Sequence, residues 1–207
     1  MSVALAALED QARVCTRCAL SRTRIQAVPG SGDPAARIMI VGEAPGKNED
    51  EQGVPFVGAA GQLLNKLLAS IEVPREEVYI TNIVKCRPPA NRDPLPDEVA
   101  ACSPYLDQQV GLIHPAVILL LGRHAVQRLL PGSDGISRIH GTLVETGDRS
   151  YVPLYHPAAA LYNGFLVETL QADFQRVRGY IDVIEERRRQ EAAQATPADP
   201  EQQLSLW

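Results

Sequence analysis

The chain has 207 residues, which is enough for one compact domain with a short appendage. Its 45% hydrophobic and 22% charged residues are typical of a folded soluble protein and exclude a disordered or fibrous chain. Because 20 Lys and Arg stand against 25 Asp and Glu, the formal charge of −5 gives no overall attraction for nucleic acid. Any phosphate-binding surface must therefore be a local basic patch.

The longest apolar run, residues 116–121, is too short to cross a bilayer, and the first residues lack the pattern of a signal peptide. We therefore expect a cytoplasmic protein without membrane contacts. Four cysteines in such a chain favour metal ligation or catalysis over a disulfide scaffold.

Apolar strand patterns and helical patterns alternate along the chain. Strands are predicted at residues 37–41, 78–84 and 116–121, and more weakly at 151–155. Helices are predicted at residues 60–68, 97–113 and 123–130. This alternation predicts an α/β protein with a buried parallel sheet covered on both faces, and ligands at the carboxyl ends of its strands.

The composition changes near the end of the chain. A helix is expected to end within the charged run at residues 185–189, and residues 190–202 are polar with two prolines. We therefore predict a domain at residues 1–189 and a flexible tail at 190–207.

The four cysteines have metal-ligand spacing. Cys15 and Cys18 form a C-x2-C pair, and Cys86 and Cys102 can complete a four-sulfur shell in the fold. Such a saturated site is structural, because it has no open position for catalysis. The spacing leaves zinc, an iron–sulfur cluster and four unrelated buried thiols as alternatives.

Two loops follow predicted strands. Lys85, Arg87 and Arg92 lie in a proline-rich loop that is either a phosphate-binding ledge or a solvated turn. Residues 42–58 are rich in Gly, Pro and acidic residues and match neither a P-loop nor a dinucleotide motif. They suit a neutral ring stacked on Phe56, although composition alone also fits a structural turn.

Several ordered segments together resemble one known family. They are residues 42–46 (Gly-Glu-Ala-Pro-Gly), 55–58 (Pro-Phe-Val-Gly), 60–64 (Ala-Gly-Gln-Leu-Leu), 81–89 (Thr-Asn-Ile-Val-Lys-Cys-Arg-Pro-Pro), 91–92 (Asn-Arg) and 156–157 (His-Pro). From Cys15 to Leu161 the chain resembles the family 4 uracil-DNA glycosylases. The resemblance implies a three-layer α/β/α sandwich with a four-stranded, mainly parallel sheet. It also implies one 4Fe-4S cluster on Cys15, Cys18, Cys86 and Cys102.

The resemblance also assigns residues to uracil. Phe56 would stack on the extruded base, and the Asn82 amide would read its Watson–Crick edge. Backbone groups of Gly42, Glu43 and Ala44 would add donors. His156, as a neutral donor, would hold the negative charge that develops on departing uracil.

Water and DNA need further groups. Glu43 and Asn91 are the candidates for placing or activating water, because Ala44 stands where other families of the superfamily have Asp. Lys85, Arg87 and Arg92 would contact DNA, and Leu161 would fill the vacated base stack. Other members have Arg where this chain has Tyr162, and thymine rejection would fall to Glu49 or nearby backbone.

The last five residues resemble the pentapeptide with which bacterial repair proteins dock on the sliding clamp. Gln203, Leu204, Leu206 and Trp207 would make the contacts, with Trp in place of the usual Phe. A chance match or a tail that packs on its own domain is the alternative.

Together these residues predict a monomeric, monofunctional uracil-DNA glycosylase of base excision repair that leaves an abasic site. A non-catalytic or covalent uracil-DNA binder of the same superfamily is the main alternative. A zinc enzyme acting on free nucleotides is a third hypothesis, and it requires an open metal site.

Overall fold

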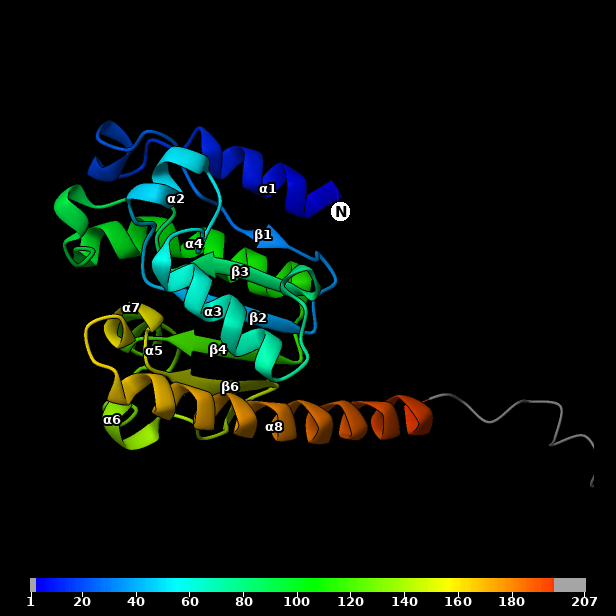
Figure 1. Ribbon diagram of the computed structural model, residues 1–207. Helices are drawn as coiled ribbons and strands as arrows, with labels where there is room; N and C mark the ends of the chain where they lie inside the picture. Colours follow the sequence, from blue (N-terminus) through cyan, green and yellow to red (C-terminus); the bar gives the residue numbers. More distant parts are fainter. Residues whose placement is uncertain (1–2, 196–207) are drawn as a thin grey trace, which may run out of the picture.

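A six-stranded sheet forms the centre of the protein in the computed structural model, which describes residues 3–195 and side chains up to residue 190 (Figure 1). The strand order is β1-β3-β2-β4-β6-β5. The strands are β1 (Ser31–Gly32), β2 (Ile38–Gly42), β3 (Val78–Asn82), β4 (Val117–Leu121), β5 (Val144–Thr146) and β6 (Arg149–Leu154).

The four central strands run parallel, as the sequence predicts, whereas the two edge strands are antiparallel. The expected count of four strands is therefore wrong. β1 and β5 contain only two and three residues, and neither is fully buried, so no apolar run marks them. A turn at Gly147, with φ of 62°, joins β5 to β6.

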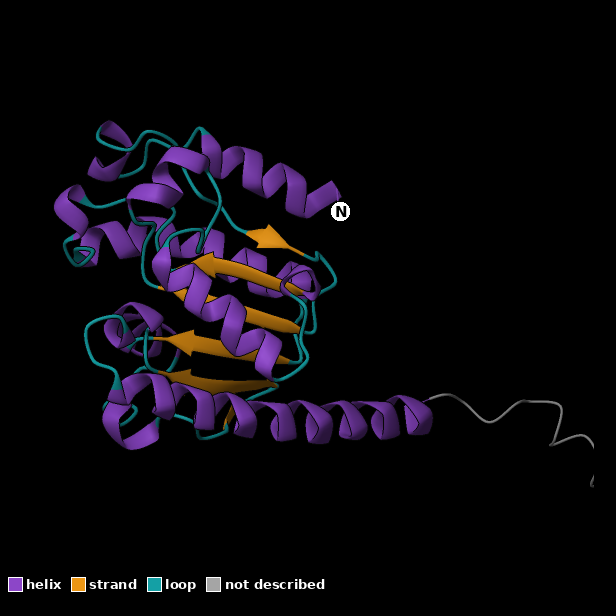
Figure 2. Ribbon diagram, in the orientation of Figure 1, coloured by secondary structure: helices purple, strands orange, loops and turns teal. Residues whose placement is uncertain are grey.

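Helices cover both faces of the sheet, which gives the expected α/β/α layers (Figure 2). They are α1 (Val3–Arg13), α2 (Lys47–Gln52), α3 (Ala59–Ser70), α4 (Pro96–Ile113), α5 (Arg123–Leu129), α6 (Ile136–Ile139), α7 (Pro157–Ala160) and α8 (Phe165–Ala195). Short 3-10 turns occupy Ala19–Arg22, Arg75–Glu77 and Pro89–Asn91.

Two separate cores result from the alternation of side chains along the strands. Met39 and Val41 of β2 pack with residues of α1, α4 and α5 on one face. Ile38 and Ile40 pack with residues of α3 and α8 on the other face. A strand buried on both faces has no polar alternation, which is why these strands read as continuous apolar runs.

The final helix differs most from the expectation. α8 runs to Ala195, six residues past the predicted domain boundary at residue 189. In the added turn the Gln190 amide donates to Glu186 Oε1 at 2.9 Å, and residues 190–195 are good helix formers.

No helix in the described part of the chain has both the length and the apolarity to span a bilayer.

The register brings the functional segments to one edge of the sheet. Gly42 and Asn82 are partners at the carboxyl ends of β2 and β3. His156 lies two residues after β6, whose carboxyl end is level with that of β4. Residues from three loops therefore meet at the edge where ligands bind in parallel sheets.

Candidate active site

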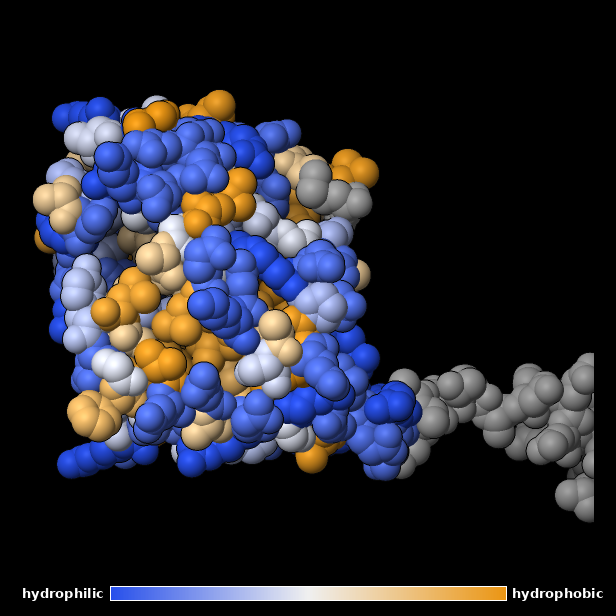
Figure 3. All heavy atoms as spheres, viewed as in Figure 1, coloured by the Kyte–Doolittle hydropathy of each residue, from blue (hydrophilic) through white to orange (hydrophobic). Residues whose placement is uncertain are grey.

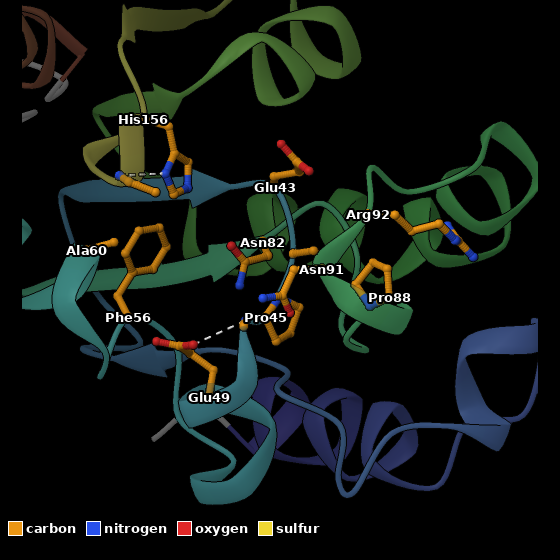
Figure 4. Close-up of a pocket in the computed structure, with 13 residues that line it drawn as sticks. Glu43, Pro45, Glu49, Phe56, Ala60, Asn82, Pro88, Asn91, Arg92 and His156 are labelled. Carbon is orange, nitrogen blue, oxygen red and sulfur yellow. Dashed lines mark hydrogen bonds between the residues drawn. The ribbon is translucent and has the colours of Figure 1, made fainter. Parts of the chain in front are cut away.

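A cavity of about 360 Å³ opens at this edge. Its volume is in the range of small-ligand sites. Figure 4 shows His156, Phe56, Asn82 and Asn91 around the same space. Residues of five segments line the cavity: Glu43, Ala44, Pro45, Gly46, Glu49, Phe56, Ala60, Asn82, Pro88, Asn91, Arg92, His156 and Ala158.

Gly42 lets two of these side chains approach each other. A Cβ at this position would lie 2.5 Å from Asn82 Oδ1 and 2.7 Å from the Phe56 ring. Any larger residue would push apart the ring and the amide. Gly42 is therefore needed for space, although it does not itself line the cavity.

Phe56 forms one wall in a strained conformation. Its φ is 54° and the residue is 6% exposed. α3 crosses so close to it that a Cβ on Gly61 would lie 1.8 Å from the Phe56 carbonyl oxygen. Such a backbone persists only where its surroundings hold it in place.

Glu49 holds this wall. One carboxylate oxygen accepts the backbone N–H groups of Val57 and Gly58, both at 2.9 Å, and the other accepts that of Gly46 at 3.1 Å. The side chain thus ties the Phe56 loop to the loop after β2. The sequence suggested Glu49 only for thymine rejection, because the three donors converge on it only in the fold.

Asn82 carries an unpaired buried oxygen. The residue is 1% exposed, and its Oδ1 is the one buried side-chain nitrogen or oxygen within residues 3–190 that has no hydrogen-bond partner. Leaving a buried acceptor unpaired costs about 1–3 kcal/mol. An acceptor left in this state beside a cavity marks the place where a ligand donor belongs.

His156 faces the Phe56 ring, with ring centroids 5.6 Å apart and an angle of 27° between the planes. It caps α7, and its Nδ1 accepts the backbone N–H of Ala158 at 3.1 Å. The proton of the neutral ring is therefore assigned to Nε2. Burial lowers the pKa of His156 to about 4, so the ring is neutral at physiological pH.

Glu43 and Asn91 line the cavity on the side opposite His156 and Phe56 (Figure 4). Burial raises the pKa of Glu43, while the nearby His124, 3.8 Å away, opposes the increase. Oxygens of Glu43 and Asp93 and a nitrogen of His124 lie within 4.8 Å of one another. Asn91 Oδ1 accepts from Arg87 Nε at 2.7 Å, which leaves the Asn91 amide N–H groups free of this bond.

The basic loop differs from its prediction at one residue. Lys85 is 1% exposed, and its Nζ donates to Thr81 Oγ1, the Asn82 carbonyl and Gln109 Oε1 at 2.6–2.7 Å. The prediction that Lys85 contacts DNA is therefore wrong, because this ammonium group lies inside the protein. Arg87 is partly exposed, which is compatible with its predicted role.

Arg92 is also partly exposed, but it pairs with Glu98. Its two terminal nitrogens lie 2.6 and 2.8 Å from the Glu98 oxygens. This pairing holds the pKa of the Glu98 carboxyl below its usual range.

Leu161, which is predicted to fill the vacated base stack, is 47% exposed just beyond α7. The predicted clamp-binding residues, Gln203, Leu204, Leu206 and Trp207, lie outside the described residues.

The four cysteines line a second, smaller cavity, and none forms a disulfide. Cys86 Sγ accepts from Arg24 Nη1 at 3.0 Å, and Cys102 Sγ accepts from the Lys85 backbone N–H at 3.2 Å. Burial raises the pKa of Cys86 to about 11, so without a metal this thiol is a poor nucleophile. The arrangement fits a ligand set and does not fit a catalytic cysteine.

The distances between the sulfurs bear on which metal they suit. No three of them lie within 4.8 Å of one another, since the one such group of ligand atoms in residues 3–195 is that of Glu43, Asp93 and His124. A tetrahedral zinc with bonds of about 2.3 Å would bring its sulfurs to about 3.8 Å. As they are placed, the four sulfurs are therefore not gathered closely enough for a single tetrahedral zinc ion.

Comparison with known proteins agrees with this geometry. The model of the uracil DNA glycosylase superfamily matches residues 29–178. The chain is 45% identical over 183 residues to the type-4 uracil-DNA glycosylase of Sulfurisphaera tokodaii, covering 83% of this chain and 82% of the relative. This chain belongs to the type-4 uracil-DNA glycosylases.

Two further type-4 glycosylases support the assignment. That of Archaeoglobus fulgidus is 48% identical over 171 residues, which is 79% of this chain and 86% of the relative. That of Thermotoga maritima is 39% identical over 178 residues, which is 84% of this chain and 93% of the relative. The family resemblance drawn from the motifs is therefore confirmed.

Proposed function

We propose that this type-4 glycosylase excises uracil from DNA by hydrolysing the N-glycosidic bond, and leaves an abasic site. The observation that carries the proposal is the unpaired Asn82 Oδ1 beside the cavity. Uracil presents an N3–H donor that this oxygen can accept, and its O4 can accept from the Asn82 amide nitrogen. Cytosine presents the reverse pattern, so in the same pose its groups would face like groups.

Base binding uses the walls already described. An extruded uracil would stack on Phe56 and take its place in the cavity between that ring and Asn91. Glu43 and Ala44 line the same cavity, and their backbone would supply polar groups for the base. Glu49 and Gly46 line it as well, so we keep Glu49 as the candidate for excluding the thymine methyl group.

His156 would stabilise the leaving group. As the glycosidic bond breaks, negative charge develops on uracil and positive charge develops on the sugar. The Nε2–H of a neutral His156 donates to the uracil oxygen without having to lose its proton. Such a preorganised donor typically contributes about 100- to 1,000-fold in rate.

Water would be placed by Asn91 and Glu43. Asn91 is held by Arg87, and its amide lines the cavity. Glu43 lines the same cavity as Asn91. As a carboxylate it would accept the proton that water loses on attacking the sugar. Because the sugar is already cation-like, position matters more than basicity.

The four cysteines would hold one 4Fe-4S cluster. Their shared cavity, the spacing of their sulfurs and the N–H donors directed at Cys86 and Cys102 fit such a group. When bound, it supplies a structural cross-link with no open coordination position. It would join the segment after α1 to the basic loop and to α4.

DNA would lie across the cavity mouth. Arg87 and Arg92 would contact phosphates, and Leu161 would enter the base stack. The protein would act as a monomer, and the terminal residues 203–207 would bind a sliding clamp. Deleting these five residues without loss of clamp binding would contradict the last proposal.

The test compares identical oligonucleotides that carry uracil, thymine or cytosine at one position. Treatment with protein and then alkali should break the strand only at uracil, and Asn82→Ala should lose this activity. Breakage without alkali would contradict a monofunctional enzyme. An intact strand that stays attached to the protein through denaturation would instead show a covalent uracil-DNA binder.

A further inference from the structure

Two aromatic side chains stand in solvent just beyond the pocket. Tyr162 is 93% exposed and Phe165 is 83% exposed, whereas every other Phe and Tyr in residues 3–190 is buried or partly buried. Together with Leu161 they place three exposed hydrophobic side chains within five residues. Exposed aromatic groups gathered at one place usually mark a binding surface.

Their position ties them to the active site. α7 begins at the His156 cap and ends four residues later, so Leu161 follows the cavity wall after a single helical turn. α7 packs against α3 and α8. In Figure 1, α7 and the start of α8 lie at the edge where the central strands end. Figure 3 shows further hydrophobic side chains gathered between α3 and α8 on this face.

Hydrogen bonds tie down the backbone of the segment, while its two aromatic rings are exposed. The Tyr162 N–H donates to the Ala159 carbonyl at 3.3 Å. Asn163 Oδ1 accepts the Phe165 N–H at 3.2 Å, and its carbonyl accepts that of Leu166 at 3.0 Å. These hydrogen bonds restrain the backbone that carries the two rings, and such restraint reduces the entropy lost when a partner binds.

The composition of residues 157–165 indicates which part of DNA they can contact. Residues 157–165 contain no charged side chain, so they offer phosphate groups no ion pair. Aromatic faces in an uncharged segment suit the faces of nucleobases, and every base has such a face. We propose that Tyr162 and Phe165 form an aromatic platform that stacks on DNA bases next to the extruded uracil.

The platform rests on the proposed function, because it needs DNA across the cavity mouth. It adds binding energy that does not depend on salt. Stacking of one base on an aromatic side chain corresponds to about a 5- to 150-fold change in affinity on substitution by alanine. Phosphate contacts instead set the slope of affinity against salt concentration.

The experiment measures fluorescence anisotropy of a labelled DNA duplex that contains a tetrahydrofuran abasic-site analogue. This probe needs no bond cleavage, so a failure of the proposed chemistry does not affect it. The variants are Tyr162→Ala, Phe165→Ala and Tyr162→Phe. Val183→Ala is the matched control, because Val183 is 63% exposed on α8 away from this loop.

Each alanine variant should bind the duplex about 5- to 150-fold more weakly, with an unchanged salt slope. Tyr162→Phe and Val183→Ala should bind like the wild type. With 2-aminopurine placed beside the analogue, the wild type should quench its fluorescence, and the Tyr162→Ala, Phe165→Ala double variant should not. Loss of quenching without unfolding would support stacking over a structural role.

Two results would overturn the proposal. Alanine variants that bind as tightly as the wild type would show that the rings do not touch DNA, and a change in self-association would then assign them to a protein interface. A salt slope reduced by about one in Tyr162→Ala would indicate a phosphate contact instead. A wild type that binds the analogue but does not excise uracil would refute the proposed function alone.

Discussion

Replacing Lys85 with Met tests the buried polar network behind the active site. Lys85 Nζ donates to Thr81 Oγ1, to the Asn82 carbonyl and to Gln109 Oε1, and all these groups are buried. Gln109 Nε2 donates in turn to the Tyr79 hydroxyl at 3.0 Å. Methionine has a similar shape but donates no hydrogen bond, so three buried acceptors each lose one donor, and only a longer contact of 3.4 Å from Thr81 Oγ1 remains for Gln109 Oε1.

The expected loss follows from those three bonds. At about 1–3 kcal/mol for each unpaired acceptor, the sum is about 3–9 kcal/mol, from which the avoided cost of burying an ammonium group is subtracted. We expect Lys85→Met to lower the free energy of unfolding by about 3 kcal/mol. For a chain of this size that corresponds to a fall in Tm of about 6–12 °C.

The same substitution should reduce activity. Because Lys85 holds the Asn82 carbonyl, the amide that reads uracil loses part of its support, and small shifts of such a group cost about 10- to 100-fold in rate. The assay is thermal unfolding followed by circular dichroism, together with kcat/KM on a uracil-containing oligonucleotide. Metal content per chain is measured and matched between samples, since Lys85 adjoins Cys86, a residue of the proposed cluster site.

Lys66→Met is the control, because Lys66 is exposed on α3 and its replacement should change stability by less than about 0.5 kcal/mol. A Tm of Lys85→Met equal to that of the control would refute the network argument. A raised Tm would show that burying the ammonium group costs more than its three bonds return.

Three other substitutions test the pocket. His156 has a pKa of about 4 in the folded protein and about 6.5 in the unfolded chain, so the unfolded state binds more protons between these pH values. The free energy of unfolding should therefore fall by up to about 3 kcal/mol as the pH drops from 6.5 to 4. In unfolding measurements at several pH values, His156→Gln should lose this dependence. Gly42→Ala should lower kcat/KM about 100-fold, because its Cβ would displace Asn82 and Phe56; a rate near that of the wild type would show that the walls adapt. Glu49→Gln should lower stability by about 2 kcal/mol in denaturant titrations, because an amide cannot accept all three backbone N–H groups; equal midpoints would contradict that role.

The sequence predicted what depends on local pattern. The four central strands were found because each is apolar on both faces, and the helices at 60–68 and 97–113 agree with α3 and α4 to within two residues at each end. The edge strands were missed because their pairing partners, and not their own residues, make them strands. α8 continues past residue 189 because residues 190–195 are polar but contain neither Gly nor Pro, and a polar composition alone does not end a helix.

In the active site, too, the residues of local motifs were predicted, whereas a position that depends on long-range contacts was not. His156, Phe56 and Asn82 were identified by motif, and the structure brings them to one cavity. Lys85 was misassigned because a basic residue between a strand and a proline-rich loop has the pattern of a phosphate contact. Only the fold shows that Gln109, 24 residues away, turns towards it and removes it from solvent. Long-range hydrogen bonds of this kind leave no local pattern.

One short segment links the uracil pocket to the cysteine site. Within residues 81–86, Asn82 faces the cavity, Lys85 is bonded through its side chain to the Asn82 carbonyl, and Cys86 lines the cysteine cavity. The Lys85 backbone N–H also donates to Cys102 Sγ at 3.2 Å. A displacement of the cysteine loop is therefore transmitted to Asn82 through a single buried lysine. Removing the proposed cluster should thus weaken uracil discrimination even though no cysteine lines the pocket, and Lys85→Met should reduce this coupling.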